Sequence, residues 1–290
     1  MNLQYIGFIA ISAFLHAFYN FLMRKAGGNK GFLLTMFLMA TGIAVSISVL
    51  TVRHAAIPWS HLPYVYGASF FYILYQNLVS KAYEKGNISA LYPLTVLSPI
   101  FIPIWASLFL SESISFLTGI GILVTVAGAI CVNLGSFSLQ EFKKIFQLHK
   151  DYLGARFALA ASFVYSFGAI FDKARIASFD VTTYLSIILI FMTSNMVLYW
   201  FFWEKEEILP VVRAHWKSGL LGGIALYLSF LFFRIALKEV FVSLAVPIRQ
   251  VAIVFAIVLG TLFLEEEFKV TNAIGSLVII LGIILVNMGA

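Results

Sequence analysis

The sequence predicts an all-α membrane protein with ten transmembrane helices in two inverted five-helix repeats. Three observations carry this prediction: the composition, the spacing of the apolar runs, and a repeat that relates the two halves of the chain. Hydrophobic residues make up 61% of the 290 residues and charged residues only 11%, and the mean hydropathy is +0.97. A soluble domain is about one quarter charged, because its surface must face water. This composition therefore excludes a soluble protein and indicates a multi-pass membrane protein.

Ten apolar runs are long enough to cross the bilayer core, which takes about 20 mostly apolar residues per helix. Charged and turn-forming residues separate the runs, beginning with Arg24 to Lys30 after the first of them. No segment alternates apolar and polar residues over about ten positions, which excludes a transmembrane β-barrel. The predicted spans are 3–24, 32–52, 63–83, 89–110, 114–135, 153–172, 181–203, 217–237, 240–263 and 271–289.

The basic residues indicate how the chain crosses the membrane. Most of the 19 Lys and Arg follow odd-numbered spans, where Arg24, Lys25 and Lys30 form the first cluster. The positive-inside rule places these loops in the cytoplasm and both termini outside. The topology accounts for the formal charge of +6, so no nucleic-acid partner is expected.

The two halves of the chain match when one is shifted by 154 positions, and the opening helices match with a shift of about 149, which pairs Phe14 with Phe163. Because five helices is an odd number, the second half must enter the membrane in the opposite orientation. Inverted repeats are typical of alternating-access transporters, whose substrate site lies at the repeat interface near the midplane. The matched pairs include Ser89 with Ser243, Pro93 with Pro247, Glu112 with Glu266, Gly121 with Gly275, Gly128 with Gly282 and Asn133 with Asn287.

This repeat divides the chain into a first repeat (1–135), a connector (136–151) and a second repeat (152–290). The connector mixes apolar and basic residues, as in Phe142-Lys143-Lys144-Ile145-Phe146. That pattern is typical of an amphipathic helix at the lipid headgroups.

Several of these motifs resemble those of a known family. The opening segment Ser12-Ala13-Phe14-Leu15-His16-Ala17-Phe18-Tyr19-Asn20 resembles the first helix of the drug/metabolite transporter superfamily. So does Gly86-x-x-Ser89-x-x-x-Pro93 followed by Leu110-x-Glu112, which the second half repeats as Ser243-x-x-x-Pro247 and Leu264-x-Glu266, with Val240 in place of the glycine. Nearly the whole chain resembles two tandem EamA domains, and the opening segment faintly resembles membrane proteins associated with phosphonate utilisation. The resemblance implies a bundle around a central cavity in a bacterial inner membrane.

Arg249 is the strongest candidate for binding cargo. It lies about ten residues, or ~15 Å, into its predicted span, where a charge costs several kcal/mol. Pro247 loosens the helix nearby, and its counterpart Pro93 lies in a span with three prolines. Thr95 occupies the position equivalent to Arg249, so the charge breaks the symmetry of the repeat and suits an anionic cargo. The alternative is a structural arginine, paired with Asp172 or capping free carbonyl groups.

Other candidates are polar or aromatic side chains in mid-span. His16 shares a helix face with Tyr19 and Asn20, and all three are candidates for binding cargo. His16 is also a candidate for proton coupling, because histidine titrates near neutral pH. Asp172 is a second proton-coupling candidate, although its place at a span end favours an interface role. The same end position predicts that Arg234 snorkels to the headgroups. Packing or interhelical bonding is the alternative role of every candidate, and the remaining cargo-binding candidates are Tyr72, Gln76, Tyr92 and Tyr227.

Two acidic residues and four glycines are predicted to be structural. Glu112 and Glu266 start tight turns, where a negative charge before a helix N-terminus is favourable. The paired glycines allow close helix approach. We find no HExxH, Walker A, GxSxG or CxxC motif, so we expect no enzyme activity, metal or cofactor.

The predicted function is secondary active transport of a small polar, anionic metabolite, by a monomer or, alternatively, a homodimer, with the bilayer as its surroundings. An exporter of drugs or amino-acid-like compounds is one alternative, and a cationic cargo would require an unpaired carboxylate in the cavity. A flippase for a lipid-linked precursor is another alternative, and it would need a lateral opening toward lipid.

Overall fold

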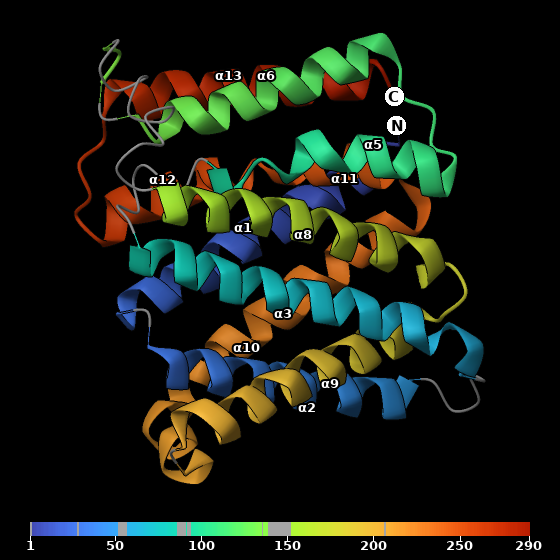
Figure 1. The fold of residues 1–290 in the computed structure, drawn as a ribbon, viewed down its shortest axis with the longest axis vertical. Coiled ribbons are helices and arrows are strands. Elements are labelled where there is room, and N and C mark those ends of the chain that lie inside the picture. Colours follow the sequence, from blue (N-terminus) through green and yellow to red (C-terminus); the bar gives the residue numbers. More distant parts are fainter. Residues whose placement is uncertain are drawn as a thin grey trace.

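The computed structural model describes residues 2–27, 29–51, 57–85, 91, 94–134, 136–138, 152–205 and 207–290, and all regular secondary structure in them is helical (Figure 1). The first half contains α1 (Leu3–Lys25), α2 (Lys30–Thr51), the short 3-10 helix η1 (Trp59–His61), α3 (Leu62–Lys85), α5 (Ser98–Leu110) and α6 (Phe116–Val132). The second half contains α8 (Tyr152–Ile176), α9 (Val181–Tyr199) with the π-helical turn η2 (Trp200–Glu204), α10 (Ile208–Glu239), α11 (Val242–Arg249), α12 (Ala252–Phe263) and α13 (Val270–Met288).

Seven helical segments in the described residues are long and apolar enough to cross a membrane, judged by length and composition. They are α1, α2, α8, α9 with η2, α10, α11 with α12, and α13. Of the other predicted spans, α3 has 24 residues but is less apolar, while α5 and α6 have 13 and 17 residues. Within the predicted span 89–110, helix α5 begins at Ser98.

Local sequence explains where several helices begin. Asp180 caps α9, because its carboxylate accepts hydrogen bonds from the backbone N–H groups of Thr182 (2.9 Å) and Thr183 (3.1 Å). The prediction for α10 was wrong at its start, which lies at Ile208 rather than at 217. Pro210 is tolerated in the first turn of a helix, and Arg213 remains exposed, so the polar stretch continues the helix instead of breaking it.

Glycines allow α6 and α13 to pack in direct backbone contact. A Cβ atom at Gly121 would lie 2.5 Å from the backbone nitrogen of Val286, and one at Gly128 would lie 2.6 Å from that of Ile279. Residue numbers rise along α6 as they fall along α13, so these equivalent helices of the two halves are antiparallel. The predicted packing role of these glycines is therefore confirmed.

The two halves share one interior. Across the halves, α1 packs against α10, α3 against α8 and α2 against both α9 and α10. The largest apolar core contains buried residues from both halves, among them Phe32, Ile102, Tyr184 and Leu226. A polar side chain on any of these inner faces is therefore enclosed by helices of both halves.

The described ends of the chain lie at the same end of the bundle, which we call the terminal face (Figure 1). Near it, the side chain of Ser115 at the start of α6 donates a 2.7 Å hydrogen bond to the carbonyl oxygen of Gly289. The ring of Phe8 stacks on that of Phe232 near the end of α10, with the ring centroids 5.8 Å apart.

We expect reporter fusions at the N-terminus and the C-terminus to lie on the same side of the membrane. The physical reason is that α1 begins and α13 ends at the terminal face. Two reporters measure this directly, one that is active only outside the cytoplasm and one that is active only inside it. Opposite sides for the two fusions would contradict the arrangement.

Candidate functional site

Arg249 is the last residue of α11, at a break in the predicted span 240–263. Pro247 lies two residues earlier, and the helix continues through turns of the i to i+3 type. The backbone N–H of Gln250 bonds the carbonyl of Pro247 at 3.1 Å, and that of Val251 bonds the carbonyl of Ile248 at 3.2 Å. The single predicted helix is therefore two helices, because proline removes a donor and weakens the regular ladder. The break places a guanidinium inside the bundle.

The Arg249 side chain contacts helices of both halves. Its terminal nitrogen donates a 3.1 Å hydrogen bond to the hydroxyl of Ser229 on α10, and it lies 3.4 Å from Nδ1 of His16 on α1. The guanidinium carbon lies 4.3 Å from the ring centroid of Phe233. Within the described part of the chain, no carboxylate lies within ion-pair distance of Arg249, and its buried Nε has no hydrogen-bond partner. Arg249 is thus a cation for which these residues provide no counter-ion.

The predicted face of α1 meets this cation. The hydroxyl of Tyr19 bonds Nδ1 of His16 at 2.6 Å, and the two rings are edge to face. Because Arg249 carries only donors, Nδ1 of His16 can accept from it only in the tautomer whose ring hydrogen lies on Nε2. Asn20 is bound to its own helix, because its amide donates a 2.8 Å bond to the carbonyl of His16.

Two serines that the sequence analysis did not single out hold the arginine in place. The Ser12 hydroxyl donates to the carbonyl of Ser229 at 2.7 Å, and the Ser229 hydroxyl donates to the carbonyl of Ser12 at 2.9 Å. Both serines are fully buried. This reciprocal pair joins α1 to α10 and orients the Ser229 oxygen that accepts from Arg249. The available signal was the presence of small polar residues in otherwise apolar spans.

A buried ion pair lies beside this site and corrects two predictions. The Arg234 guanidinium donates a 2.8 Å hydrogen bond to the Asp172 carboxylate, and their side chains are 3% and 0% exposed. Arg234 therefore does not snorkel, and the partner of Asp172 is Arg234 rather than Arg249. The hydroxyl of Tyr72 donates to the same carboxylate oxygen at 2.9 Å, and the other oxygen has no partner among the described residues.

Tyr165 on α8 connects the ion pair to the arginine. Its ring centroid lies 5.4 Å from that of Tyr72 and 5.1 Å from that of Tyr75, and its hydroxyl is close enough to Arg249 for electrostatic coupling. The shift of 149 that relates the opening helices makes Tyr165 the equivalent of His16, since 16 plus 149 is 165. The repeat register was therefore the signal that could have identified it.

The remaining candidates are not joined to this cluster by any described hydrogen bond. Gln76 is exposed on α3, one turn beyond Tyr72. Tyr227 is 2% exposed, and its hydroxyl has no hydrogen-bond partner in the described residues. Tyr92 and Pro93 lie outside the described residues, whereas the second proline, Pro247, lies in α11 two residues before Arg249.

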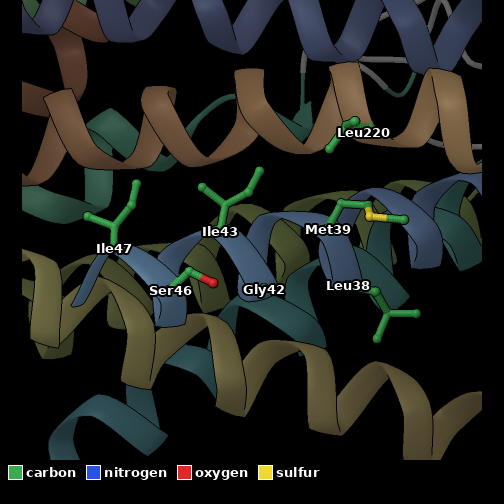
Figure 2. A pocket seen from close by; sticks show the side chains of 7 residues that line it. All are labelled: Leu38, Met39, Gly42, Ile43, Ser46, Ile47 and Leu220. Carbon is green, nitrogen blue, oxygen red and sulfur yellow. The ribbon is translucent and has the colours of Figure 1, made fainter. Parts of the chain in front are cut away.

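The groove in Figure 2 is separate from this polar cluster. It has a volume of about 390 Å³ and lies between α2 and α10. Its lining is almost entirely apolar, with Leu38, Met39, Gly42, Ile43, Ser46, Ile47 and Leu220. Such a surface provides one hydroxyl and no charge, so the polar cluster is the better candidate site. Among the described residues, no group of three or more His, Cys, Asp or Glu side chains could hold a metal ion.

Long apolar helices packed around a partly buried arginine define a multi-pass membrane protein. The profile of the EamA-like transporter family matches residues 3–134 and again residues 152–288, so the chain belongs to the EamA-like transporter family. This membership confirms the resemblance to the drug/metabolite transporter superfamily.

The fold also resembles solved structures. One of these, described only as "Crystal structure of protein", superimposes with a TM-score of 0.78 at 16% sequence identity. The match covers 99% of this chain and 98% of that chain, and at this identity it shows the fold alone. The comparison with curated proteins gave no match.

Proposed function

We propose that this protein is a secondary active transporter that carries a small, polar anion across a bacterial inner membrane. One observation carries the proposal: Arg249 lies inside the bundle with no carboxylate partner among the described residues. Burying a lone cation is costly, and an anionic cargo would supply the missing counter-ion. The planar guanidinium binds carboxylate, phosphate or phosphonate oxygens at two points, which suits these groups as cargo.

The buried acids favour an anion over a cation as cargo. Asp172 is paired with Arg234 and Tyr72, and the Glu112 carboxylate is bound by the backbone of α11. An exporter of cationic drugs would need an uncommitted carboxylate at the site, and these two are committed. The described site therefore has an excess of positive charge to offer to cargo.

The packing supports alternating access by two inverted halves. Position 121 of α6 packs against positions 282 and 286 of α13. Position 128 of α6 packs against positions 275 and 279. Under the shift of 154, these two contacts exchange with each other, which is what a two-fold axis between equivalent helices requires. With α3, α5 and α6 as further spans beside the seven long apolar ones, this symmetry supports ten helices in two inverted repeats around the Arg249 site.

His16 is proposed as the coupling group. Its Nδ1 faces the Arg249 guanidinium, and part of its surface is accessible, as is part of that of Arg249. Positive charge on both side chains would be mutually repulsive, whereas a bound anion would screen that repulsion. Proton uptake and anion binding would then favour each other, as proton-coupled transport requires. Asp172 is the second candidate for this role.

Uptake into proteoliposomes with an imposed pH gradient tests the function. The panel should pair small carboxylates, phosphates and phosphonates with their neutral amides or esters and with organic cations of similar size. We expect uptake of at least one anion class, increased when the compartment that holds the anion is acidic. Uptake confined to cations or neutral compounds would contradict the proposal.

We expect Ser229→Ala to weaken binding of the transported anion by about tenfold, because the hydrogen bond that orients the Arg249 guanidinium is lost. Ser12→Ala is the matched control, since it removes a hydroxyl of the same buried pair and leaves the acceptor of Arg249 in place. The concentration dependence of uptake measures both variants. Equal effects of the two substitutions would show that the serines act only through helix packing.

A further inference from the structure

A carboxylate of the first half caps a helix of the second half. Glu112 follows α5 and is only 3% exposed. Its two oxygens accept hydrogen bonds from the backbone N–H groups of Val242 (2.8 Å) and Ser243 (3.1 Å), and from the Ser243 hydroxyl (2.6 Å). The helix that follows Glu112 in sequence, α6, has its own cap in Ser115. Glu112 therefore lies at a helix N-terminus as predicted, but the helix is α11 of the second half rather than the next helix in sequence.

Opposite charges hold the corner between α10 and α11. Glu112 lies at the positive N-terminal end of α11, and Lys173 donates a 2.7 Å bond to the carbonyl of Leu237 at the negative C-terminal end of α10. Because α11 has only eight residues, Arg249 lies about 10 Å from Val242, at the other end of the same rigid element. Fixing the start of α11 therefore fixes the depth and direction of the Arg249 side chain.

The repeat provides a comparison at the opposite end of the bundle. Glu266 is the equivalent of Glu112, and the preceding Glu265 and Ser111 share the same left-handed backbone, with φ of 55°. The backbone N–H of each equivalent glutamate bonds a carbonyl six residues earlier at 3.2 Å. However, Glu266 forms an ion pair with Arg24, and both of those side chains are well exposed. The same turn thus holds a buried interhelical cap at the terminal face and an exposed ion pair at the other face.

We propose that Glu112 is a positioning residue of the Arg249 site, a clamp between the halves that fixes α11 and keeps the terminal face closed in this conformer. The alternating-access cycle then requires the clamp to release α11 before the site can open to that face. The role assigned to Arg249 rests on the proposed function, whereas the closure of the terminal face can be measured without any cargo.

Thiol labelling in vesicles tests the clamp. Ser12 is fully buried and lies one helical turn from His16, on the side of the terminal face. A cysteine at this position, introduced as Ser12→Cys in a Cys131→Ser background, can react only when that face opens. The probe is a membrane-impermeant maleimide added from the side that carries a terminal tag. We expect Glu112→Gln to raise the labelling rate by about tenfold or more, because the charge-assisted bonds to α11 are weakened.

Three variants make the result specific. Glu112→Asp keeps the charge and should restore part of the protection, while Ser243→Ala removes only the hydroxyl bond and should raise labelling less than Glu112→Gln. Glu266→Gln is the matched control at the other face and should leave labelling from the terminal face unchanged.

An unchanged labelling rate in Glu112→Gln, or an equal rise in Glu266→Gln, would overturn the clamp. If Glu112→Gln does not insert into the membrane, the labelling rate of Ser243→Ala tests the clamp instead. An unchanged rate in that variant would overturn the clamp. Failure of the anion-uptake panel leaves this measurement intact, so the two proposals can fail separately.

Discussion

Arg249→Ala is expected to abolish transport of the anion while the protein still folds and inserts. Removing the guanidinium removes the only charge at the break between α11 and α12, and with it the proposed partner for the cargo. The folded bundle loses one hydrogen bond to Ser229 and a contact with the ring of Phe233. It also no longer holds a partly buried cation without a counter-ion, so the net cost to stability should be small.

Arg249→Lys is the graded variant for this prediction. Lysine keeps the charge but loses the planar fork, so we expect partial activity with a raised apparent KM. Uptake should be measured alongside thermal unfolding in detergent for both variants. Full transport by Arg249→Ala at normal stability would remove Arg249 from the cargo site and leave the charge of the cargo open.

Asp172→Asn and Arg234→Gln are each expected to lower the free energy of unfolding by about 3–5 kcal/mol, because each leaves an uncompensated charge in a dry interior. The double variant should recover most of that loss, since two amides can still bond each other and the Tyr72 hydroxyl keeps an acceptor. Thermal unfolding of the two single variants and the double variant forms the cycle that isolates the pair.

Lys30→Gln is the matched control for this cycle. Lys30 pairs with Glu204 at 2.7 Å, but its side chain is 58% exposed, so the change should cost no more than about 1 kcal/mol. Additive losses from Asp172→Asn and Arg234→Gln would mean that the two side chains do not stabilise each other. In that case Asp172 would be free of its partner and would become the stronger candidate for carrying the proton.

Much of the site could be predicted because a buried charge is costly wherever the chain folds. Depth within an apolar run singled out Arg249, and the spacing of His16, Tyr19 and Asn20 defined one face of α1. The structure brings Arg249 and His16 together, and the proline at 247 lies at the helix break. Each of these inferences needed only helix geometry and the thickness of a bilayer.

The pairing of side chains could not be predicted in the same way. Asp172 and Arg234 both lie near the ends of their predicted spans, so both were predicted to lie at the membrane surface. Nothing in their spacing showed that α8 and α10 bring them together in the interior. Ser229 and Tyr165 were missed for a related reason. A serine or tyrosine in an apolar span carries no charge penalty, so it is less conspicuous than a charged residue. The repeat register and the apolar surroundings could mark such positions, but only the structure shows their partners.

Composition and spacing were enough to predict a multi-pass helical membrane protein, a repeat that relates its halves, and the charge that is hardest to bury. These properties follow from composition and periodicity, because they depend on the lipid surroundings and on helix geometry rather than on contacts between particular side chains. The packing of the helices was needed to show that Arg249 faces His16 and Ser229, that Asp172 pairs with Arg234, and that Glu112 caps α11 across the two halves. Those choices depend on which helices pack together and on the rotation of each helix about its axis. A difference of one residue turns a side chain by about 100° and gives it other partners.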